Sequence, residues 1–396
     1  MSNTSTAPSP FFRRLLSPLT RLRLANKLSF RRSATALPEY VPPPATTEPL
    51  DWAELAIIDL SKANTPEGRK ALAEEVVQAM NTQGFFYVIN HGYTLEQTRR
   101  MFAIASSTFD DVDSEEKKIY MGKSPAVYEG YKPRQTWQIE QGVTDQIEHY
   151  NINHAVRERM HPHVLRPHLD EIEKFARHNH THILFTILRL MAMGMQLPED
   201  IFVDMHHFEA TGESSVRFMK YYPRSPEEEV QTRNVWLKGH TGLTEKVHIG
   251  CISDIGSITI LWSQPISGLQ ILSRDGVWRY IKHIENALVV NSGDVMQLLS
   301  GNFYKPTIHR VIQPPKDQER LERLGVFYFA MAADDVRLAS VGAGAASESE
   351  KAQAPTMSDW RKERTERYGT GSMKPSSKEE KVQEEVILGV VVKEYN

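Results

Sequence analysis

The hydrophobic pattern changes about halfway along the chain, from helical spacing to short extended segments. Residues 66–83 have apolar side chains at the three- to four-residue spacing of one buried helix face: Leu72, Val76, Val77 and Met80. The same spacing predicts further helices over residues 94–108 and 166–195. Aromatic and β-branched runs at residues 55–60 and 84–89 predict strands on either side of the first helix. The N-terminal half is therefore predicted to start as strand, helix, strand and to continue with packing helices.

From about Val216 onward, short β-type segments alternate with Gly, Pro and Asp. The predicted strands cover residues 216–221, 257–261, 269–272, 278–280, 287–291, 307–312 and 324–330. Regularly spaced short strands are typical of a β-sandwich or barrel. The strand pattern ends after Ala330, and one more helix is expected near residues 357–368. The sequence assigns no role to residues 378–396.

The overall composition favours a protein that acts on a small molecule. The 396 residues include 47 Lys and Arg against 50 Asp and Glu, so that no basic excess points to nucleic acid or to a membrane surface. Cys251 is the single cysteine, which excludes an internal disulfide framework. No apolar run approaches the roughly 20 residues that span a bilayer. We expect a soluble protein and take a monomer as the starting assumption, because the sequence does not define the oligomeric state.

The first 38 residues differ from the rest because they contain seven basic residues and no acidic residue. This composition is typical of a mitochondrial presequence, but prolines interrupt any amphipathic helix there, so a disordered basic tail is the alternative. Prolines 38, 42, 43 and 44 then predict an extended linker, with order beginning near Leu50. We expect a cytoplasmic protein, with a mitochondrial location as the alternative.

Two possible metal ligands stand in the β-rich half. Asp254 precedes a predicted strand, and His309 lies on another strand 55 residues later. A carboxylate and two imidazoles on one side of an iron ion are the ligands of many non-haem oxygenases. Taken alone, a histidine on a strand is more often a surface or core residue than a metal ligand. An Asp close to a Gly is likewise more often part of a turn than a metal ligand. Arg323 could bind a dicarboxylate through paired hydrogen bonds or could simply form a surface ion pair.

Several ordered motifs, taken together, resemble those of the isopenicillin N synthase-like oxygenases. In the N-terminal half they are residues 57–60, 84–88, 90–92 and 130–131; in the β-rich half they are residues 221–223, 268–270, 278, 289–294 and 309–311. The resemblance covers roughly residues 52–335. It implies an α+β protein with a mainly β core, a double-stranded β-helix (jelly roll), supported by an N-terminal helical and mixed domain.

Composition and the resemblance together give a predicted domain organisation. Residues 1–48 are expected to be a disordered basic and proline-rich segment, and residues 49–205 the N-terminal domain. Residues 206–335 are expected to form the jelly-roll domain, and residues 336–396 a C-terminal extension.

The family's iron ligands come from a His-X-Asp motif and a distal histidine, which match Asp254 and His309. The position two residues before Asp254 is Ile252, which cannot bind a metal. His240 and Thr241, however, end a segment that resembles the family's approach to its own His-Thr. Residues 242–253 therefore look like a 12-residue insert that splits the motif.

Three arrangements of the third ligand remain open. An insert that leaves and re-enters the strand at one point would keep His240 beside Asp254, because loop-closure cost rises slowly with length. His248, inside the insert, is a substitute ligand. The site could also lack a third protein ligand, and an incorrect exon boundary would produce the same insert.

The co-substrate site is expected at Arg323, which matches the arginine of the family's Arg-X-Ser pair. Gly325 stands where the serine hydroxyl would be, and Tyr222 is a possible additional hydrogen-bond donor. The resemblance implies an Fe(II)-, 2-oxoglutarate- and O2-dependent oxygenase that hydroxylates, desaturates or cyclises a small metabolite and releases succinate and CO2. Because the motif is interrupted, the alternative is a pseudoenzyme that binds a small acid or a protein partner without turnover.

Overall fold

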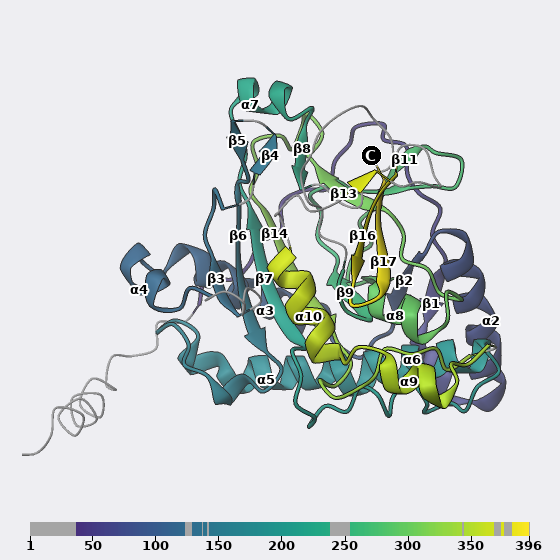
Figure 1. The fold of residues 1–396 in the computed structure, drawn as a ribbon. Helices are drawn as coiled ribbons and strands as arrows, with labels where there is room; N and C mark the ends of the chain where they lie inside the picture. Colours follow the sequence, from purple (N-terminus) through teal and green to yellow (C-terminus); the bar gives the residue numbers. More distant parts are fainter. Residues whose placement is uncertain are drawn as a thin grey trace, which may run out of the picture. The chain divides into compact units, whose positions relative to one another are not determined.

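The computed structural model describes residues 37–122, 129–136, 138–140, 142–237, 254–342, 344–367, 374–375 and 382–395. Two β-sheets face each other, and helices cover the outer side of the larger sheet (Figure 1). All of the elements below belong to the unit Pro38–Asn396.

The larger sheet has eight strands in the order β1-β2-β12-β9-β14-β7-β6-β3. Their bounds are β1 Ile57–Asp59, β2 Phe85–Ile89, β3 Gly130–Lys132, β6 Ile147–Asn153, β7 Ser215–Tyr221, β9 Ile258–Trp262, β12 Leu288–Ser292 and β14 Arg323–Ala330. Only the β1–β2 pair is parallel. Strands from both halves of the chain thus form one continuous sheet.

The smaller sheet has four antiparallel strands in the order β11-β10-β13-β8. They are β8 Val235–Leu237, β10 Leu269–Leu272, β11 Trp278–Tyr280 and β13 His309–Ile312. From β7 to β14 the chain passes repeatedly between the two sheets, which is the winding of a jelly roll. The core therefore has the predicted architecture. The boundary between residues 205 and 206 stays a prediction, since β1, β2, β3 and β6 extend the same sheet as β7.

The helices lie mainly in the first half and at the C-terminus. They are α2 Pro66–Thr82, α3 Leu95–Asp110, α4 Ser114–Ile119, α5 Leu169–Arg177, α6 Phe185–Gly194, α7 Pro226–Gln231, α8 Asp294–Leu299, α9 Glu348–Gln353 and α10 Met357–Arg367. Thr65 caps α2, and Thr94 with Gln97 forms a capping box on α3. A π-helix, His178–Leu184, separates α5 from α6, so the single helix expected over residues 166–195 is interrupted.

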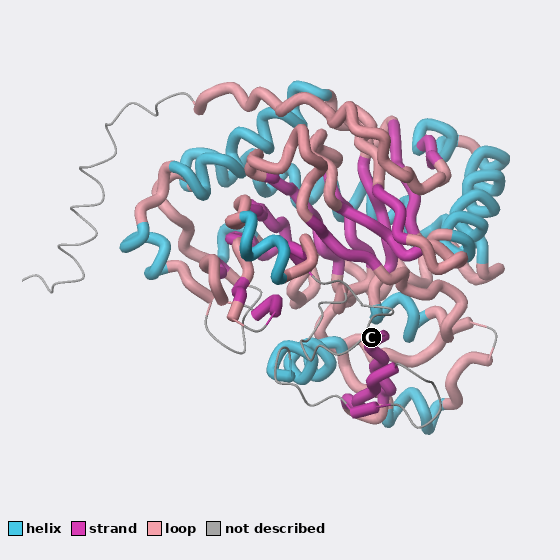
Figure 2. Tube along the Cα trace, turned by 90° about the horizontal axis from the view of Figure 1, so that it is seen from above, coloured by secondary structure: helices cyan, strands magenta, loops and turns pink. Residues whose placement is uncertain are grey.

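The central strands β9, β12 and β14 of the larger sheet are buried on both faces. On the outer face α3 contacts β7 and β14, and the Trp262 indole N–H donates to Asn179 of the π-helix. On the inner face one apolar cluster joins both sheets, including Phe85, Met219, Trp236 and Val311. This double burial explains why these three strands appear in the sequence as almost continuous apolar runs. Figure 2 shows these strands in magenta with helices beside them.

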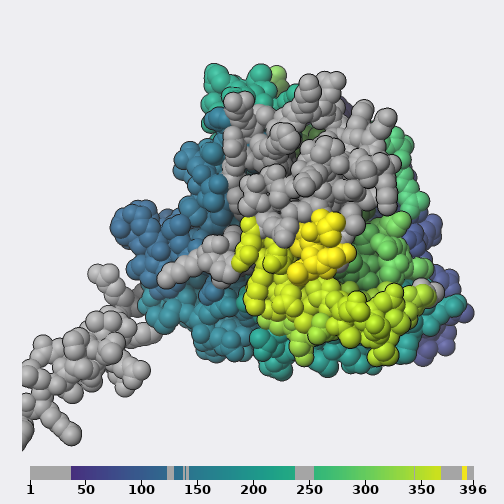
Figure 3. Space-filling model, in the orientation of Figure 1, coloured from purple at the N-terminus to yellow at the C-terminus, as the bar shows by residue number. Residues whose placement is uncertain are grey.

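The segments before and after the sheets also pack on this unit. Thr46 and Thr47 hydrogen-bond to Asp317, and Gln318 donates to the carbonyl of Pro44, so this part of the expected disordered segment is held in place. After β14 the described elements are helices α9 and α10 and strands β15 Lys374–Pro375, β16 Val382–Ile387 and β17 Val390–Tyr395. Helices α9 and α10 form part of the surface in Figure 3. Within the described ranges no helix combines the length and the apolar character needed to cross a membrane.

Candidate metal and co-substrate site

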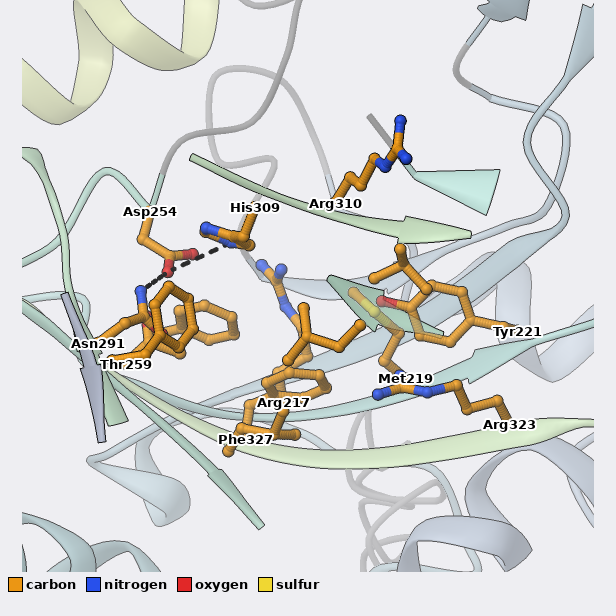
Figure 4. A pocket seen from close by; sticks show the side chains of 15 residues that line it. Arg217, Met219, Tyr221, Asp254, Thr259, Asn291, His309, Arg310, Arg323 and Phe327 are labelled. Carbon is orange, nitrogen blue, oxygen red and sulfur yellow. Dashed lines mark hydrogen bonds and ion pairs between the residues drawn. The ribbon is translucent and has the colours of Figure 1, made fainter. Parts of the chain in front are cut away.

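A cavity of about 70 Å³ lies between the two sheets. Figure 4 shows the side chains of the residues that line it. They are Phe85, Arg217, Met219, Tyr221, Asp254, Thr259, Leu261, Leu269, Asn291, His309, Arg310, Val311, Arg323, Phe327 and Phe329. An apolar wall with a few convergent polar groups is the usual form of a small-molecule site. Three of the five predicted site residues, Asp254, His309 and Arg323, meet here.

Asp254 and His309 are placed to share one cation. His309 Nε2 lies 4.0 Å from Asp254 Oδ2. Metal bonds to nitrogen and oxygen ligands of about 2.1 Å allow one ion to contact both atoms. His309 Nδ1 lies 2.9 Å from the carbonyl oxygen of Thr307, which favours the tautomer with Nε2 unprotonated and able to bind metal. The two side chains therefore fit a metal ion.

Asn291 is a site residue for which the sequence predicted no role. Its Nδ2 donates to Asp254 Oδ2 at 2.6 Å and so orients the carboxylate beside His309. Asn291 lies on β12, next to β9, within the motif of residues 289–294 that contributed to the family resemblance. Position in that motif was the only sequence signal for this residue.

The backbone before β9 is anchored to the turn after β12. Asp294 N donates to the Asp254 carbonyl oxygen at 2.9 Å, and Gly293 N donates to Ser257 O at 2.9 Å. A Cβ atom at Gly293 would lie 2.2 Å from the Asp254 carbonyl oxygen, so that only glycine permits this approach. These contacts fix Asp254 from its C-terminal side.

The third metal ligand is not defined by the structure. His240 and His248, together with the insert of residues 242–253, lie outside the described residues. Among the residues that are described, no group of three His, Cys, Asp or Glu side chains is arranged to hold a metal ion. The assignment of His240 stays a prediction.

Arg323 lies at the other end of the cavity. It is the first residue of β14, is 3% exposed and is directly opposite Tyr221 of β7. Burial lowers the pKa of the Arg323 guanidinium, since desolvation disfavours the charged form. Its Nε donates to Ile266 O at 3.3 Å, whereas Nη1 has no acceptor among the described residues. A buried guanidinium with an unused donor fits a ligand carboxylate.

Tyr221, rather than the predicted Tyr222, lines the cavity. Consecutive residues of an extended chain point to opposite faces, and the inward-facing positions here are 217, 219 and 221. The Tyr222 hydroxyl instead donates to Glu148 at 3.1 Å, and its ring lies beneath Arg134. Tyr222 therefore does not line this cavity, and its role as a donor to the co-substrate stays a prediction.

Gly325 leaves room for a neighbouring aromatic ring. A Cβ atom at this position would lie 2.6 Å from Phe327 Cε2. The ring thus occupies the volume that a serine side chain would need. The absence of a serine hydroxyl at position 325 therefore goes together with the position of the Phe327 ring, which a serine side chain would displace.

Two family models match the chain. One, described as the N-terminal part of a non-haem dioxygenase in morphine synthesis, matches residues 55–170. The other, the 2OG-Fe(II) oxygenase superfamily, matches residues 213–330 and so includes Asp254, His309 and Arg323.

Curated relatives and solved structures agree with these models. The chain is 30% identical over 317 residues to jasmonate-induced oxygenase 2 of Arabidopsis thaliana, covering 74% of this chain and 76% of that protein. It is 28% identical over 313 residues to the 2-oxoglutarate-dependent dioxygenase frbH of a Dothideomycetidae species, covering 74% and 87%. The fold matches that of a full-length Neurospora crassa protein crystallised in complex with alpha-KG and 5-formyluracil, with a TM-score of 0.66, 22% identity and coverage of 81% and 99%. This protein therefore belongs to the 2-oxoglutarate- and Fe(II)-dependent oxygenase superfamily and is an enzyme that requires Fe(II), 2-oxoglutarate and O2.

Proposed function

We propose that this enzyme oxidises a small organic molecule by hydroxylation, desaturation or cyclisation, with succinate and CO2 as co-products. The observation that carries the proposal is the placement of His309 Nε2 beside Asp254 Oδ2 in a cavity that also contains the buried Arg323. Iron(II) bound there with 2-oxoglutarate supplies the oxygen activation. Asp254, His309 and His240 are proposed as its three protein ligands, and the first two lie within the described residues.

Neighbouring polar groups of the protein orient the proposed metal ligands and the co-substrate. Asn291 holds the Asp254 carboxylate in position, and the Thr307 carbonyl oxygen holds the His309 ring. Outer hydrogen bonds of this kind typically raise metal affinity 10- to 100-fold. Arg323 is proposed to bind the far carboxylate of 2-oxoglutarate, with Tyr221 opposite it. This arrangement orients the co-substrate along the cavity from Arg323 towards the metal ligands.

The cavity wall around these polar groups is mostly apolar. Phe85 packs edge-on against the His309 ring, with ring centroids 5.3 Å apart, and Phe327 and Phe329 stack on β14. A dry cavity strengthens the electrostatic interactions inside it and limits side reactions. The second sheet closes the cavity through Leu269 and Val311.

The test is anaerobic Fe(II) titration followed by 2-oxoglutarate turnover under oxygen. We expect about one iron per chain and succinate formation, with both lost in Asp254→Ala and His309→Ala. His163→Ala is the matched control, because this exposed imidazole hydrogen-bonds to Glu116 outside the cavity. If the wild-type chain binds no iron and forms no succinate, the proposed oxidation is wrong. The remaining alternative is then a pseudoenzyme that binds a small acid or a protein partner without turnover.

A further inference from the structure

A buried glutamine joins the N-terminal segment to the loop that contacts Arg323. Gln318 is 2% exposed and lies in the connection between β13 and β14. Its Oε1 accepts from the Ser267 backbone N–H at 2.9 Å, and its Nε2 donates to the carbonyl oxygens of Pro265 at 3.1 Å and Pro44 at 2.8 Å. One side chain thus bridges two segments that lie far apart in the sequence.

The loop of residues 264–267 helps to set the position of the Arg323 guanidinium. Arg323 Nε donates to the Ile266 carbonyl oxygen at 3.3 Å. The same residue is fixed by Gln264, whose Oε1 accepts from Ile266 N at 2.8 Å and whose Nε2 donates to Ile266 O at 2.7 Å. Gln264 and Gln318 therefore both hold this loop, and a shift of the loop would move the acceptor that orients the guanidinium.

A second contact docks the N-terminal segment beside Gln318. The Asp317 carboxylate accepts from the Thr46 hydroxyl at 2.7 Å and from the Thr47 backbone N–H at 2.9 Å. The hydrogen bond from the Thr47 N–H is the main reason why the pKa of Asp317 lies below its ordinary value. The carboxylate is therefore ionised at neutral pH and holds residues 40–47, which we call the N-terminal arm.

The N-terminal arm also lies close to Arg323. The Tyr40 ring stacks on Phe102 of α3, with ring centroids 5.1 Å apart. Burial raises the pKa of the Tyr40 hydroxyl to about 12, and the positive charge of Arg323 opposes this rise. Residues of the arm line a cavity of about 300 Å³ together with Gln264 and Pro265 of the loop. The arm, the loop and the arginine thus form one connected region.

We propose that Gln318 is a positioning residue through which the docked N-terminal arm sets the affinity for 2-oxoglutarate. This inference rests on the proposed function, because it requires Arg323 to bind the far carboxylate of the co-substrate. Neither Gln318 nor the arm is among the described residues that line the cavity between the sheets, so both act through the loop and the Ile266 carbonyl. A guanidinium already held in one orientation loses less conformational freedom when it binds a carboxylate, which makes the complex tighter.

The test compares two acids that differ only at the end that Arg323 would bind. 2-Oxoglutarate and 2-oxopentanoate share the 2-oxo acid group that chelates a metal, but a methyl group replaces the far carboxylate in 2-oxopentanoate. The full chain, loaded anaerobically with Mn(II), is titrated calorimetrically with each acid. The ratio of the two dissociation constants measures the preference for the far carboxylate, which we expect to be about 100-fold in the wild type.

The variants separate positioning from a general effect on the fold. Arg323→Gln should abolish the preference. Gln318→Ala should lower it about tenfold, and Asp317→Ala, at an exposed residue that docks the arm, about threefold, with the binding of 2-oxopentanoate unchanged in both. Asp317→Asn keeps an acceptor oxygen and should restore most of the preference. Asp275→Ala is the matched control, because this exposed carboxylate makes its hydrogen bonds within its own hairpin.

A further variant covers the possibility that Gln318→Ala does not fold. Gln318→Glu has nearly the same shape and keeps the oxygen that accepts from Ser267, but it loses the donor to Pro44 and Pro265. It should lower the preference as well.

Two results would overturn the inference while leaving the proposed function intact. One is an unchanged preference in the Gln318 and Asp317 variants. The other is an equal loss of affinity for both acids, which would show that these residues only stabilise the fold. An unchanged preference in Arg323→Gln would remove both the assignment of Arg323 and the inference. Iron-dependent succinate formation is measured separately, so failure of the proposed oxidation is distinguishable from failure of the positioning role.

Discussion

At the scale of single residues, Asn291 determines how the Asp254 carboxylate is oriented for metal binding. Its amide donates to the Asp254 oxygen that faces His309, so Asn291→Ala should leave the carboxylate free to rotate. We expect Fe(II) affinity to fall between 10- and 100-fold, as it does when such outer hydrogen bonds are removed. Anaerobic Fe(II) titration measures the change. Asn64→Ala, at an exposed residue whose amide donates within its own turn, is the control, and equal iron affinity in the two variants would contradict the role of Asn291.

Gly325 provides a test of packing in the same cavity. Gly325→Ser places a side chain against the Phe327 ring, and the overpacking should lower the free energy of unfolding by about 1–3 kcal/mol. The double variant Gly325→Ser with Phe327→Leu should recover part of this loss, because the smaller side chain makes room. Urea unfolding of the three proteins measures both effects. A serine variant as stable as the wild type would show that Phe327 moves aside without cost.

At the scale of elements, the connection between Asp254 and the turn after β12 locates the metal site. Gly293→Ala would drive its new Cβ atom against the carbonyl oxygens of Asp254 and Gly256. We expect both lower stability and weaker Fe(II) binding, because the backbone that carries Asp254 must move. Gly212→Ala is the matched control, since the nearest atom to its Cβ would be 3.6 Å away. Iron affinity and thermal unfolding, measured on both variants, should change together in Gly293→Ala alone.

The insert within the metal motif offers another test at this scale. Deleting residues 242–253 places Asp254 two positions after His240, the spacing at which two side chains leave one face of a strand. We expect the shortened chain to bind Fe(II) at least as tightly as the full chain, and His240→Ala to weaken binding in both. Anaerobic Fe(II) titration of the full and the shortened chain, each with and without His240→Ala, measures these affinities. If His248→Ala, rather than His240→Ala, weakened binding in the full chain, His248 would be the third ligand.

The sequence predicted strands of both sheets closely, from the half-buried edge strand β11 to the fully buried strand β12. Strands β9, β12 and β14 are almost continuous apolar runs, and their observed bounds differ from the predicted ones by one residue at most. Strand β6 was missed because its sequence contains polar residues, which are buried only through partners on neighbouring strands, such as Arg217 for Asn151. The family resemblance predicted that Asp254 and His309 lie close together. That Tyr221 rather than Tyr222 faces the cavity followed only from the register of strand β7. Sequence spacing does not reveal which face of a strand will point into a cavity.

At the scale of the whole unit, buried histidines join the helical layer to the larger sheet. His180 of the π-helix hydrogen-bonds to the Tyr328 hydroxyl of β14, and His206 to the Ser257 hydroxyl just before β9. Burial lowers the pKa of His180 to about 3 and that of His206 to about 4, because desolvation disfavours the charged imidazolium form. Both rings are therefore neutral in the folded protein, and they hold the two layers together in that form.

This connection predicts how the stability of the protein depends on pH. The unfolded chain takes up protons at these histidines near pH 6.5, whereas the folded chain does not until well below pH 5. Stability is therefore fully present above about pH 6.5 and is lost as the pH falls towards 4, at up to about 1.4 kcal/mol per pH unit for each histidine. Urea unfolding of the metal-free protein at pH 7.5, 6.5 and 5.5 measures the slope. His180→Gln, which keeps a hydrogen-bonding side chain but does not titrate, should show a shallower slope, and a slope equal to that of the wild type would mean that other groups cause the acid sensitivity.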